Sequence, residues 1–381
     1  MIYFDNAATS LLKPDCVAEA VYHAIKELGN SNRGVHESTL NASRLLFHAR
    51  SILSDFFDGY GPEQTVFTSN ITESLNTVIQ GLFNNGDHVI TTAMEHNSVL
   101  RPLYFMENQG VSISIVNCNK EGVLEYDSLE KLIQPNTKAV ICNHASNLTG
   151  NLIDLDKITS ICKKHNLLCI LDTAQTAGVF PISMKKQGID ILCFTGHKGL
   201  FGPQGIGGLL LRDGIQITPL KYGGTGISTY LKGQPNQMPE SLEAGTVNTH
   251  GVAGLISGIE YINKTGLESI RNKELALMWK FYDGIKNLPN VKIYGDFQTK
   301  MRAAIVALNI GDYDSGFISD QLAYEYDICT RSGGHCAPLM HTALNTIEQG
   351  AVRFSFSHLN KEEEVDLAIR AITQLALLDQ Q

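Results

Sequence analysis

An aspartate and a lysine each follow an apolar segment in the middle of the chain, and together they suit one kind of cofactor chemistry. Asp172 comes directly after Leu168–Leu171, and Lys198 comes shortly after Ile191–Phe194. If both segments are strands of an open α/β sheet, the two side chains lie where such sheets bind ligands. A lysine that forms a Schiff base, faced by an aspartate, suits a carbonyl cofactor whose ring nitrogen must stay protonated. The pair alone also has a structural explanation, because an aspartate at a strand end commonly caps the next helix.

Three further features favour a cofactor that carries a phosphate. The segment Ser69–Glu73 follows an apolar run and opens a helical pattern, so free backbone N–H groups and the positive end of a helix dipole are available there. The segment Glu95–Asn97 places the His96 imidazole just after another apolar run. Glycines on both sides of Lys198 allow the backbone to approach a ligand closely. Each feature alone is explained by capping or turn formation. Together they predict one phosphate-bearing cofactor bound to the lysine.

The elements that position these residues form a repeating pattern between about residue 63 and residue 212. Short apolar runs rich in β-branched residues alternate with segments of helical period, which is typical of βαβ units and a mostly parallel sheet. The near-continuous apolar character of the runs indicates strands covered on both faces. Strands are predicted at 64–69, 88–94, 112–118, 138–145, 167–173, 189–195 and 205–212, with crossover helices at 72–83, 127–134 and 154–165.

The pattern changes near residue 250. A long helical stretch runs from 249 to about 288, followed by strand-like 291–294 and 303–309 and an amphipathic helix at 361–378. We therefore predict a large α/β domain at 14–250 and a smaller α+β domain at 251–381, with the arm 1–13 packing on the smaller domain.

Composition limits the classes of partner. The chain has 381 residues, of which 43% are hydrophobic and 18% charged, so it can bury a large core. A formal net charge of -9 argues against nucleic acid and anionic membranes as partners. No apolar run reaches the ~18 residues that cross a bilayer, and the start of the chain lacks a signal-peptide pattern. We expect a cytoplasmic protein.

The cysteines divide into two kinds. There are eight, without a CxxC pair, so the sequence predicts neither a disulfide framework nor a metal site. Most lie in apolar runs, as Cys142 and Cys169 do, where a thiol is a small core residue. Cys336 instead lies among loop-forming and cationic residues in Arg331–Pro338. It is either a loop thiol without a role or, beside a lysine-bound cofactor, a nucleophile.

Motifs along nearly the whole chain resemble those of one enzyme family. They run in order from residue 3 to about residue 370, and as a set they resemble the pyridoxal-phosphate-dependent cysteine desulfurases and selenocysteine lyases of the class V aminotransferase superfamily. The Arg-x-Gly-x-His-Cys form is similar to the group that includes SufS and CsdA. The resemblance implies fold type I of the pyridoxal-phosphate enzymes, with a mostly parallel seven-stranded sheet. The motifs lie at 3–9, 32–36, 95–97, 171–175, 196–198, 243–249 and 331–338.

The resemblance also assigns roles around the cofactor, pyridoxal 5'-phosphate. Lys198 would be the Schiff-base lysine and would move the Cα proton, and Asp172 would pair with the pyridinium nitrogen. His96 would stack on the ring and assist proton transfer as a catalytic residue, and Gln175 would hydrogen-bond the phenolic oxygen of the ring. The phosphate would be held by Asn70, Ile71, Thr72, Thr195 and His197, and by Thr246 of a second subunit, which implies a homodimer.

For the substrate, the resemblance implies L-cysteine or L-selenocysteine. Arg353 would bind the carboxylate, as a guanidinium fork is suited to do. Asn147 would lie between cofactor and substrate, and Arg331 and His36 complete the implied substrate site. Cys336 would accept the sulfur as a persulfide, releasing alanine, and would pass the sulfur to an acceptor protein. Its reference pKa of about 8.5 leaves little thiolate at neutral pH, and positive charges on Arg331 and His335 would increase that fraction.

Three alternatives remain on sequence grounds. The chain is a selenocysteine lyase, another class V aminotransferase or lyase in which Cys336 is incidental, or a non-catalytic protein that binds sulfur or metal through scattered Cys and His residues. Only the adjacent His335 and Cys336 combine two such donors closely, and adjacent residues seldom bind one tetrahedral ion.

Overall fold

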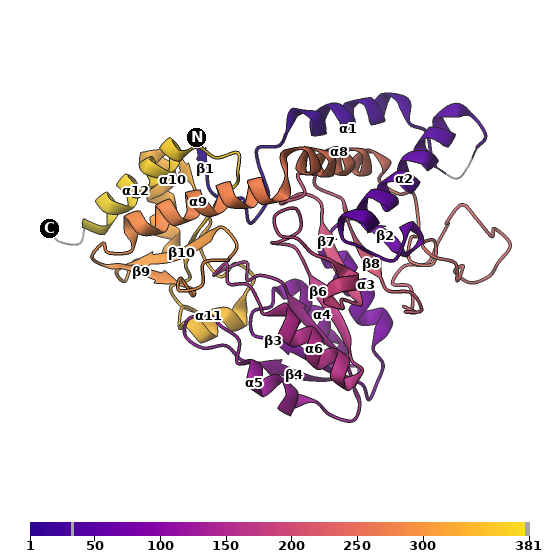
Figure 1. Ribbon diagram of the computed structural model, residues 1–381, viewed down its shortest axis with the longest axis horizontal. Helices are drawn as coiled ribbons and strands as arrows, with labels where there is room; N and C mark the ends of the chain where they lie inside the picture. Colours follow the sequence, from indigo (N-terminus) through magenta and orange to yellow (C-terminus); the bar gives the residue numbers. More distant parts are fainter. Residues whose placement is uncertain (32–33, 378–381) are drawn as a thin grey trace.

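A seven-stranded sheet organises the first two thirds of the chain in the computed structural model, which describes residues 1–31 and 34–377 (Figure 1). The strand order is β2-β8-β7-β6-β5-β3-β4, and every strand is parallel to the others except β8, which is antiparallel to both of its neighbours. The predicted α/β fold with a mostly parallel sheet is confirmed. The strands are β2 (Thr65–Thr68), β3 (His88–Thr92), β4 (Ser112–Val116), β5 (Thr137–Asn143), β6 (Leu168–Asp172), β7 (Ile191–Thr195) and β8 (Gly207–Leu211).

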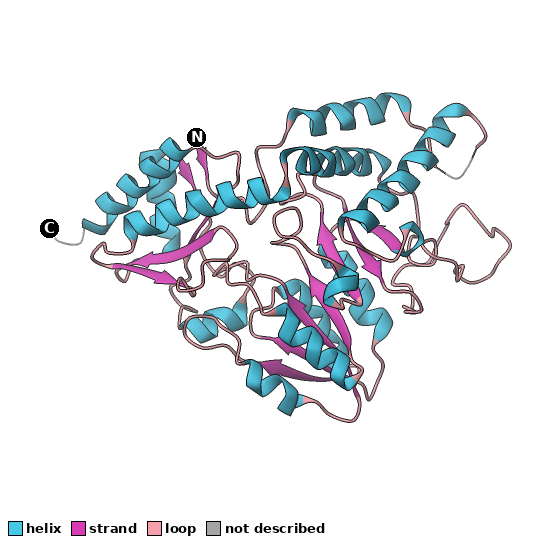
Figure 2. Cartoon of the chain, in the orientation of Figure 1, coloured by secondary structure: helices cyan, strands magenta, loops and turns pink. Residues whose placement is uncertain are grey.

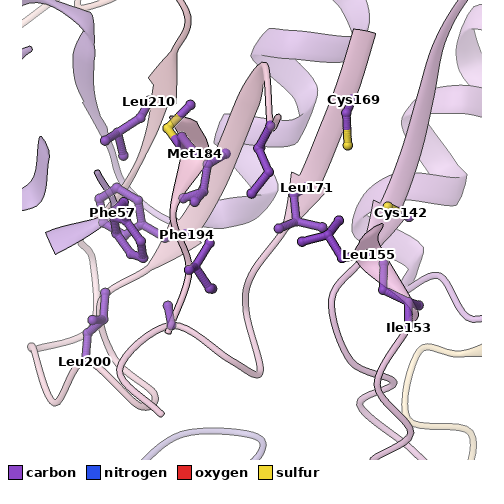
Figure 3. Packing of buried hydrophobic residues seen from close by; sticks show 14 of the residues in the cluster. Phe57, Cys142, Ile153, Leu155, Cys169, Leu171, Met184, Phe194, Leu200 and Leu210 are labelled. Atoms are coloured by element: carbon purple, nitrogen blue, oxygen red, sulfur yellow. The ribbon is translucent and has the colours of Figure 1, made fainter. Parts of the chain in front are cut away.

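Helices cover both faces of this sheet (Figure 2), which explains why its strands are apolar at successive positions. In β5, Val140 and Cys142 belong to one hydrophobic cluster, whereas Ala139 and Ile141 belong to a second cluster across the sheet. Figure 3 shows part of the first cluster around Phe194. The helices are α1 (Asp15–Glu27), α2 (Glu37–Phe56), α3 (Ile71–Leu82), α4 (Asn97–Glu107), α5 (Tyr126–Leu129), α6 (Leu155–His165), α7 (Met184–Gln187) and α8 (Thr249–Thr265), with short 3₁₀ helices at Pro62–Gln64 and Glu130–Leu132.

The rest of the chain builds a second, smaller core. Strands β12, β10 and β9 form an antiparallel sheet in that order, and α9 and α12 contribute Phe281 and Ile372 to the cluster that includes Phe354 of β12. The elements are α9 (Leu267–Ile285), β9 (Val291–Tyr294), β10 (Ile305–Ile310), α10 (Ser315–Tyr326), β11 (Ile328–Cys329), α11 (Pro338–Leu344), β12 (Val352–Ser355) and α12 (Glu362–Leu377).

The long helical stretch predicted from 249 to 288 is two helices. They meet at Gly266, which has φ +90°, a conformation that glycine adopts without the steric cost paid by other residues. Helix α8 contributes to the core of the large sheet, and α9 contributes mainly to the smaller core. We therefore propose that the two domains divide at Gly266 rather than at residue 250.

The N-terminal arm joins the two parts of the molecule. Its strand β1 (Ile2–Tyr3) pairs in parallel with β11 in the smaller part, and Phe4 packs on Phe354 and Phe356. The arm then reaches the large sheet, where the Ser10 N–H donates to the carbonyl of His197 at 3.2 Å.

Two predictions concern residues that are only partly described. Residues 32 and 33 of the 32–36 motif, and residue 378 at the predicted end of the last helix, lie outside the described residues. Within the described ranges, no helix is both long and apolar enough to span a membrane. The cytoplasmic location stays a prediction.

Candidate active site

A cavity of about 330 Å³ opens at the carboxyl ends of β5, β6 and β7. It lies at the edge of the sheet where parallel strands present ligand-binding side chains. Its lining combines strand ends, the first turn of α3, the N-terminal arm and three residues of the smaller part, Arg331, His335 and Arg353. Of the predicted site residues, it is lined by Asn70, Ile71, Thr72, His96, Asn147, Asp172, Gln175, Thr195, His197, Lys198, Arg331 and Arg353.

Lys198 and Asp172 lie in this cavity as predicted. Asp172 ends β6 and is 4% exposed, and its Oδ1 accepts from the Ala174 N–H at 2.8 Å. Burial raises the pKa of Asp172, although the positive charge of Lys198 opposes the shift. Burial, and then the nearby Arg353, lower the pKa of Lys198 to about 8. Part of the lysine is therefore a neutral, nucleophilic amine near neutral pH.

One corner of the cavity suits a phosphate. Helix α3 begins there, and its first N–H groups have no partners within the helix. The Asn70 side chain caps the helix by accepting from the Glu73 N–H at 3.0 Å. The Thr195 hydroxyl is buried and has no hydrogen-bond partner among the described residues. A buried hydroxyl without a partner is costly, so this one fits a ligand oxygen.

His96 lines both the cavity and an open pocket beside it. Its Nδ1 accepts from the Ser98 N–H at 3.0 Å, so the hydrogen-bond network assigns the ring proton to Nε2. Burial, followed by the charges of Lys198, Arg331 and Arg353, lowers the pKa of His96 to about 4. The imidazole is therefore neutral at neutral pH and can lie against a flat ring.

Arg353 is the most enclosed cation of the cavity, with 1% of its surface exposed. Its Nη1 donates to the carbonyl of Asn147 at 2.9 Å, and its Nη2 pairs with Oδ1 of Asp5 at 2.7 Å. Burial lowers its pKa, and Asp5 opposes that shift. The backbones of Arg331 and Arg353 bond to each other, which places Arg331 beside it on the cavity wall.

Cys336 does not line this cavity. It lies on an adjacent open pocket of about 570 Å³, which shares Thr72, His96 and Ser98 with the cavity. Its carbonyl accepts from the Asn97 N–H at 2.8 Å, and Asn147 Nδ2 donates to the carbonyl of His335 at 2.7 Å.

The backbone of the cysteine loop is constrained. His335 and Cys336 have φ +49° and +55°, a left-handed conformation that is uncommon for residues other than glycine. His335 Nε2 donates to the carbonyl of Arg331 at 3.1 Å. Burial lowers the pKa of His335 to about 3, so the positive charge that we expected on this residue is absent at neutral pH. A buried imidazole gives up its proton because desolvation penalises the charged form. Arg331 remains as the cation of the loop.

Two predicted residues lie outside the cavity of their own chain. His36 precedes α2 and is exposed, with its ring nitrogens bonded to Ser38 and Thr39. Thr246 lines a different pocket, beside the ion pair of Arg50 and Glu243.

The cavity also contains residues to which the sequence assigned no role. Ala7 and Ala8 of the N-terminal arm line it, as do Ser98 and Asn143. Part of the signal for Asn143 was available, because it lies near the end of the predicted strand 138–145; in the structure it ends β5 and pairs with Asp172 of β6. The arm lies in the Tyr3–Thr9 motif, but nothing in that motif shows that it reaches the cavity.

The charges favour an anionic ligand. Lys198, Arg331 and Arg353 line the cavity, whereas the carboxylates near them are Asp172 and Asp5. This excess of positive charge, with the free N–H groups of α3, suits a compound that carries a phosphate and a carboxylate.

Comparisons with known proteins give a consistent result. Residues 2–367 match the family model described as "Aminotransferase class-V". A protein of Pyrococcus abyssi (strain GE5 / Orsay) named "Probable cysteine desulfurase" is 32% identical, over 98% of this chain and 94% of its own length. A "Cysteine desulfurase" of Escherichia coli (strain SE11) is 29% identical, over 98% of this chain and 93% of its own length.

Solved structures agree with the sequence comparisons. The apo structure of a cysteine desulfurase from Thermococcus onnurineus NA1 superimposes with a TM-score of 0.92 at 34% identity, over 98% of this chain and 94% of that chain. The cysteine desulfurase CsdA from Escherichia coli superimposes with a TM-score of 0.87 at 26% identity, over 99% of this chain and 94% of that chain.

Proposed function

The chain belongs to the class V aminotransferase family, and on that premise we propose that it is a cysteine desulfurase that depends on pyridoxal 5'-phosphate. L-cysteine and the Cys336 thiol give L-alanine and a persulfide on Cys336. One observation carries the proposal. The cavity that holds Lys198 and Asp172 shares His96 with the pocket that holds Cys336.

The cavity residues fit the cofactor. Lys198 would hold it covalently, Asp172 would pair with its ring nitrogen, and His96 and Gln175 would contact the ring face and the phenolic oxygen. The Thr195 hydroxyl, which has no partner in the described part of the chain, supports a phosphate at the start of α3. Asn70, Ile71, Thr72, Thr195 and His197 would hold that phosphate. When bound, the cofactor supplies an electron-poor ring that stabilises negative charge at the substrate Cα.

Lys198 suits the proton transfers of the reaction. A base works best when its pKa is close to the working pH, and burial brings the pKa of Lys198 to about 8. Its Nζ would take the proton from the substrate Cα and return a proton to the product. Asp172 is fixed by the Ala174 N–H, and its carboxylate would pair with the ring nitrogen of the bound cofactor.

Arg353 and Asn147 suit substrate binding. The Arg353 Nε has no partner among the described residues, and the side chain lines the cavity, so donors remain for the α-carboxylate of an amino acid. Asn147 lies beside it, because the Asn147 carbonyl accepts from Nη1.

Cys336 would carry the sulfur. Its thiolate attacks the substrate Sγ, an S–S bond forms, and the Cβ–Sγ bond breaks with its electron pair left on the substrate carbon. That carbon takes a proton to become the methyl group of alanine. Because Cys336 lies on the open pocket, the persulfide would be accessible to an acceptor protein.

A homodimer would complete the site. Thr246 and His36 lie outside the cavity of their own chain, so they reach a cofactor or substrate only across a subunit interface. Exposed apolar side chains on α1 and α2, including Tyr22, Ile25 and Phe47, are consistent with such an interface.

The proposal is tested by measuring products. The holoprotein is mixed with limiting L-cysteine, and alanine, pyruvate, free sulfide and protein persulfide are quantified. A desulfurase gives alanine and persulfide in equal amounts in the first turnover. Pyruvate with free sulfide would instead identify an eliminating lyase. A strict requirement for selenocysteine would identify a selenocysteine lyase.

A further inference from the structure

Two anchors hold the guanidinium of Arg353. The side chain is 1% exposed, Nη1 donates to the Asn147 carbonyl at 2.9 Å, and Nη2 donates to Asp5 at 2.7 Å. The Nε–H has no partner among the described residues. The anchors therefore each take one hydrogen bond from Nη1 and Nη2. The Nε–H and the remaining N–H groups of the guanidinium are left for a ligand in the cavity.

Asp5 comes from the N-terminal arm and is itself held in place. Its backbone forms a β-bridge with Ser355, two residues beyond Arg353 in β12. Its carbonyl accepts from the Tyr3 hydroxyl at 3.2 Å and from the Ala8 N–H at 3.0 Å. The preceding Phe4 is fully buried. The carboxylate therefore approaches Arg353 from a fixed backbone.

The same arm continues into the cofactor side of the cavity. The Ala7 carbonyl accepts from Gln175 Nε2 at 3.1 Å, and the His197 carbonyl, just before Lys198, accepts from the Thr9 hydroxyl at 3.2 Å. The segment that holds Arg353 thus also contacts the backbone that presents Lys198.

This arrangement has a physical advantage for substrate binding. A free arginine side chain loses rotamer freedom when it orders around a carboxylate, which weakens binding. An arginine that is already anchored does not incur that loss. A purely structural role is the alternative, because a buried guanidinium requires a counter-charge whether or not it binds a ligand.

We propose that Asp5 is a positioning residue, which holds the Arg353 guanidinium in the orientation that receives the α-carboxylate of the substrate. This inference rests on the proposed function in one respect, namely that Arg353 binds the carboxylate. Asp5 acts through Arg353 and does not itself touch the substrate.

The test compares two ligands that differ only in the carboxylate. L-cysteine and cysteamine, which lacks the carboxylate, are titrated against the holoprotein carrying Cys336→Ser, and the change in the visible spectrum gives each Kd. Asp5→Ala weakens cysteine binding by about tenfold or more and leaves cysteamine binding unchanged. Asp5→Asn keeps a hydrogen-bond acceptor without the charge, so it weakens cysteine binding by only about threefold.

A matched control separates positioning from loss of an ion pair. Asp190 pairs with Arg212 at 2.5 Å, and its side chain is 15% exposed, compared with 19% for Asp5. That pair lies outside the cavity. Asp190→Ala therefore lowers the Tm but leaves the ratio of the cysteine and cysteamine Kd values unchanged.

Several outcomes would overturn the inference. The inference fails if Asp5→Ala weakens the binding of cysteine and of cysteamine by the same factor. It also fails if Asp5→Ala leaves the ratio of the two Kd values unchanged whereas Arg353→Ala changes that ratio. If neither variant changes the ratio, Arg353 does not bind the carboxylate, and this part of the proposed function fails as well. If Asp5→Ala does not fold, the ratio of the cysteine and cysteamine Kd values in Asp5→Asn decides. An unchanged ratio in Asp5→Asn overturns the inference.

Discussion

The inner cavity, which contains Lys198, and the outer pocket, which contains Cys336, share His96 but differ in how deeply their side chains are buried. In the inner cavity, Asp172 and Arg353 are almost completely buried, and burial lowers the pKa of Lys198 to about 8. The outer pocket is open and is lined by partly or fully exposed side chains such as Gln80 and Arg101, with Cys336 on its wall. The difference indicates a division of work. We propose that proton transfer at carbon takes place beside the buried charges of the cavity, and that sulfur leaves from a pocket that another molecule can reach.

The largest effect is expected when the inner cavity loses its nucleophile. Lys198→Ala removes the amine that would hold the cofactor, so the visible absorbance disappears and kcat/KM falls about 10³-fold or more. Lys131→Ala, at an exposed position, is the control and keeps both properties. A visible band in Lys198→Ala that borohydride still reduces would assign the cofactor to another lysine.

A smaller but still large effect is expected at Asp172. Asp172→Asn keeps the size of the side chain and its contact with the Ala174 N–H but loses the negative charge. The cofactor remains bound, whereas kcat falls about 10²-fold or more, because the ring nitrogen loses its charged partner. Stopped-flow spectra and steady-state rates measure the two effects separately. Turnover near the wild-type rate would remove Asp172 from the site.

The pKa of Lys198 predicts a pH dependence for cofactor attachment. Below a pH of about 8 the amine is protonated, and above it the amine is neutral and nucleophilic. At pH 7.5 about a quarter of Lys198 is neutral, compared with about a thousandth of an unperturbed lysine. The rate of attachment to cofactor-free protein should therefore rise about tenfold between pH 7 and 9 and then level off. A rate still rising steeply at pH 10 would mean that the cavity does not lower this pKa.

The smallest effect is expected at the proposed subunit interface. If Thr246 contacts the phosphate of a partner's cofactor as proposed, Thr246→Ala raises the cofactor Kd about threefold to tenfold, while the visible band of the bound form stays. Dilution that dissociates the proposed dimer should weaken cofactor retention in parallel. Sedimentation that shows a fully loaded monomer would remove Thr246 from the site.

The sequence predicted the sheet and its functional edge for the same physical reason. Strands buried on both faces must be apolar throughout, so a polar residue at the end of such a run, like Asp172, marks the ligand-binding edge. The antiparallel direction of β8 could not be predicted in this way, because an antiparallel strand inside the sheet is as apolar as a parallel one.

The parts of the site that escaped prediction depend on distant contacts. Asp5 and Arg353 are 348 positions apart in the chain, and nothing near either residue indicates the other. The neutral state of His335 depends on burial that its loop-like neighbours do not indicate. The short strands β11 and β12, which position the cysteine loop and Arg353, have too few residues to show a period.

Cys336→Ser tests most directly whether the two pockets divide the chemistry. The substitution leaves every described residue of the inner cavity in place, because Cys336 lines the outer pocket and not the cavity. L-cysteine should therefore still change the visible spectrum, with an affinity within about threefold of wild type, while alanine and persulfide formation stop, because a hydroxyl has no thiolate character. Alanine and sulfide produced from cysteine at the wild-type rate would contradict the account and show that Cys336 does not accept the sulfur.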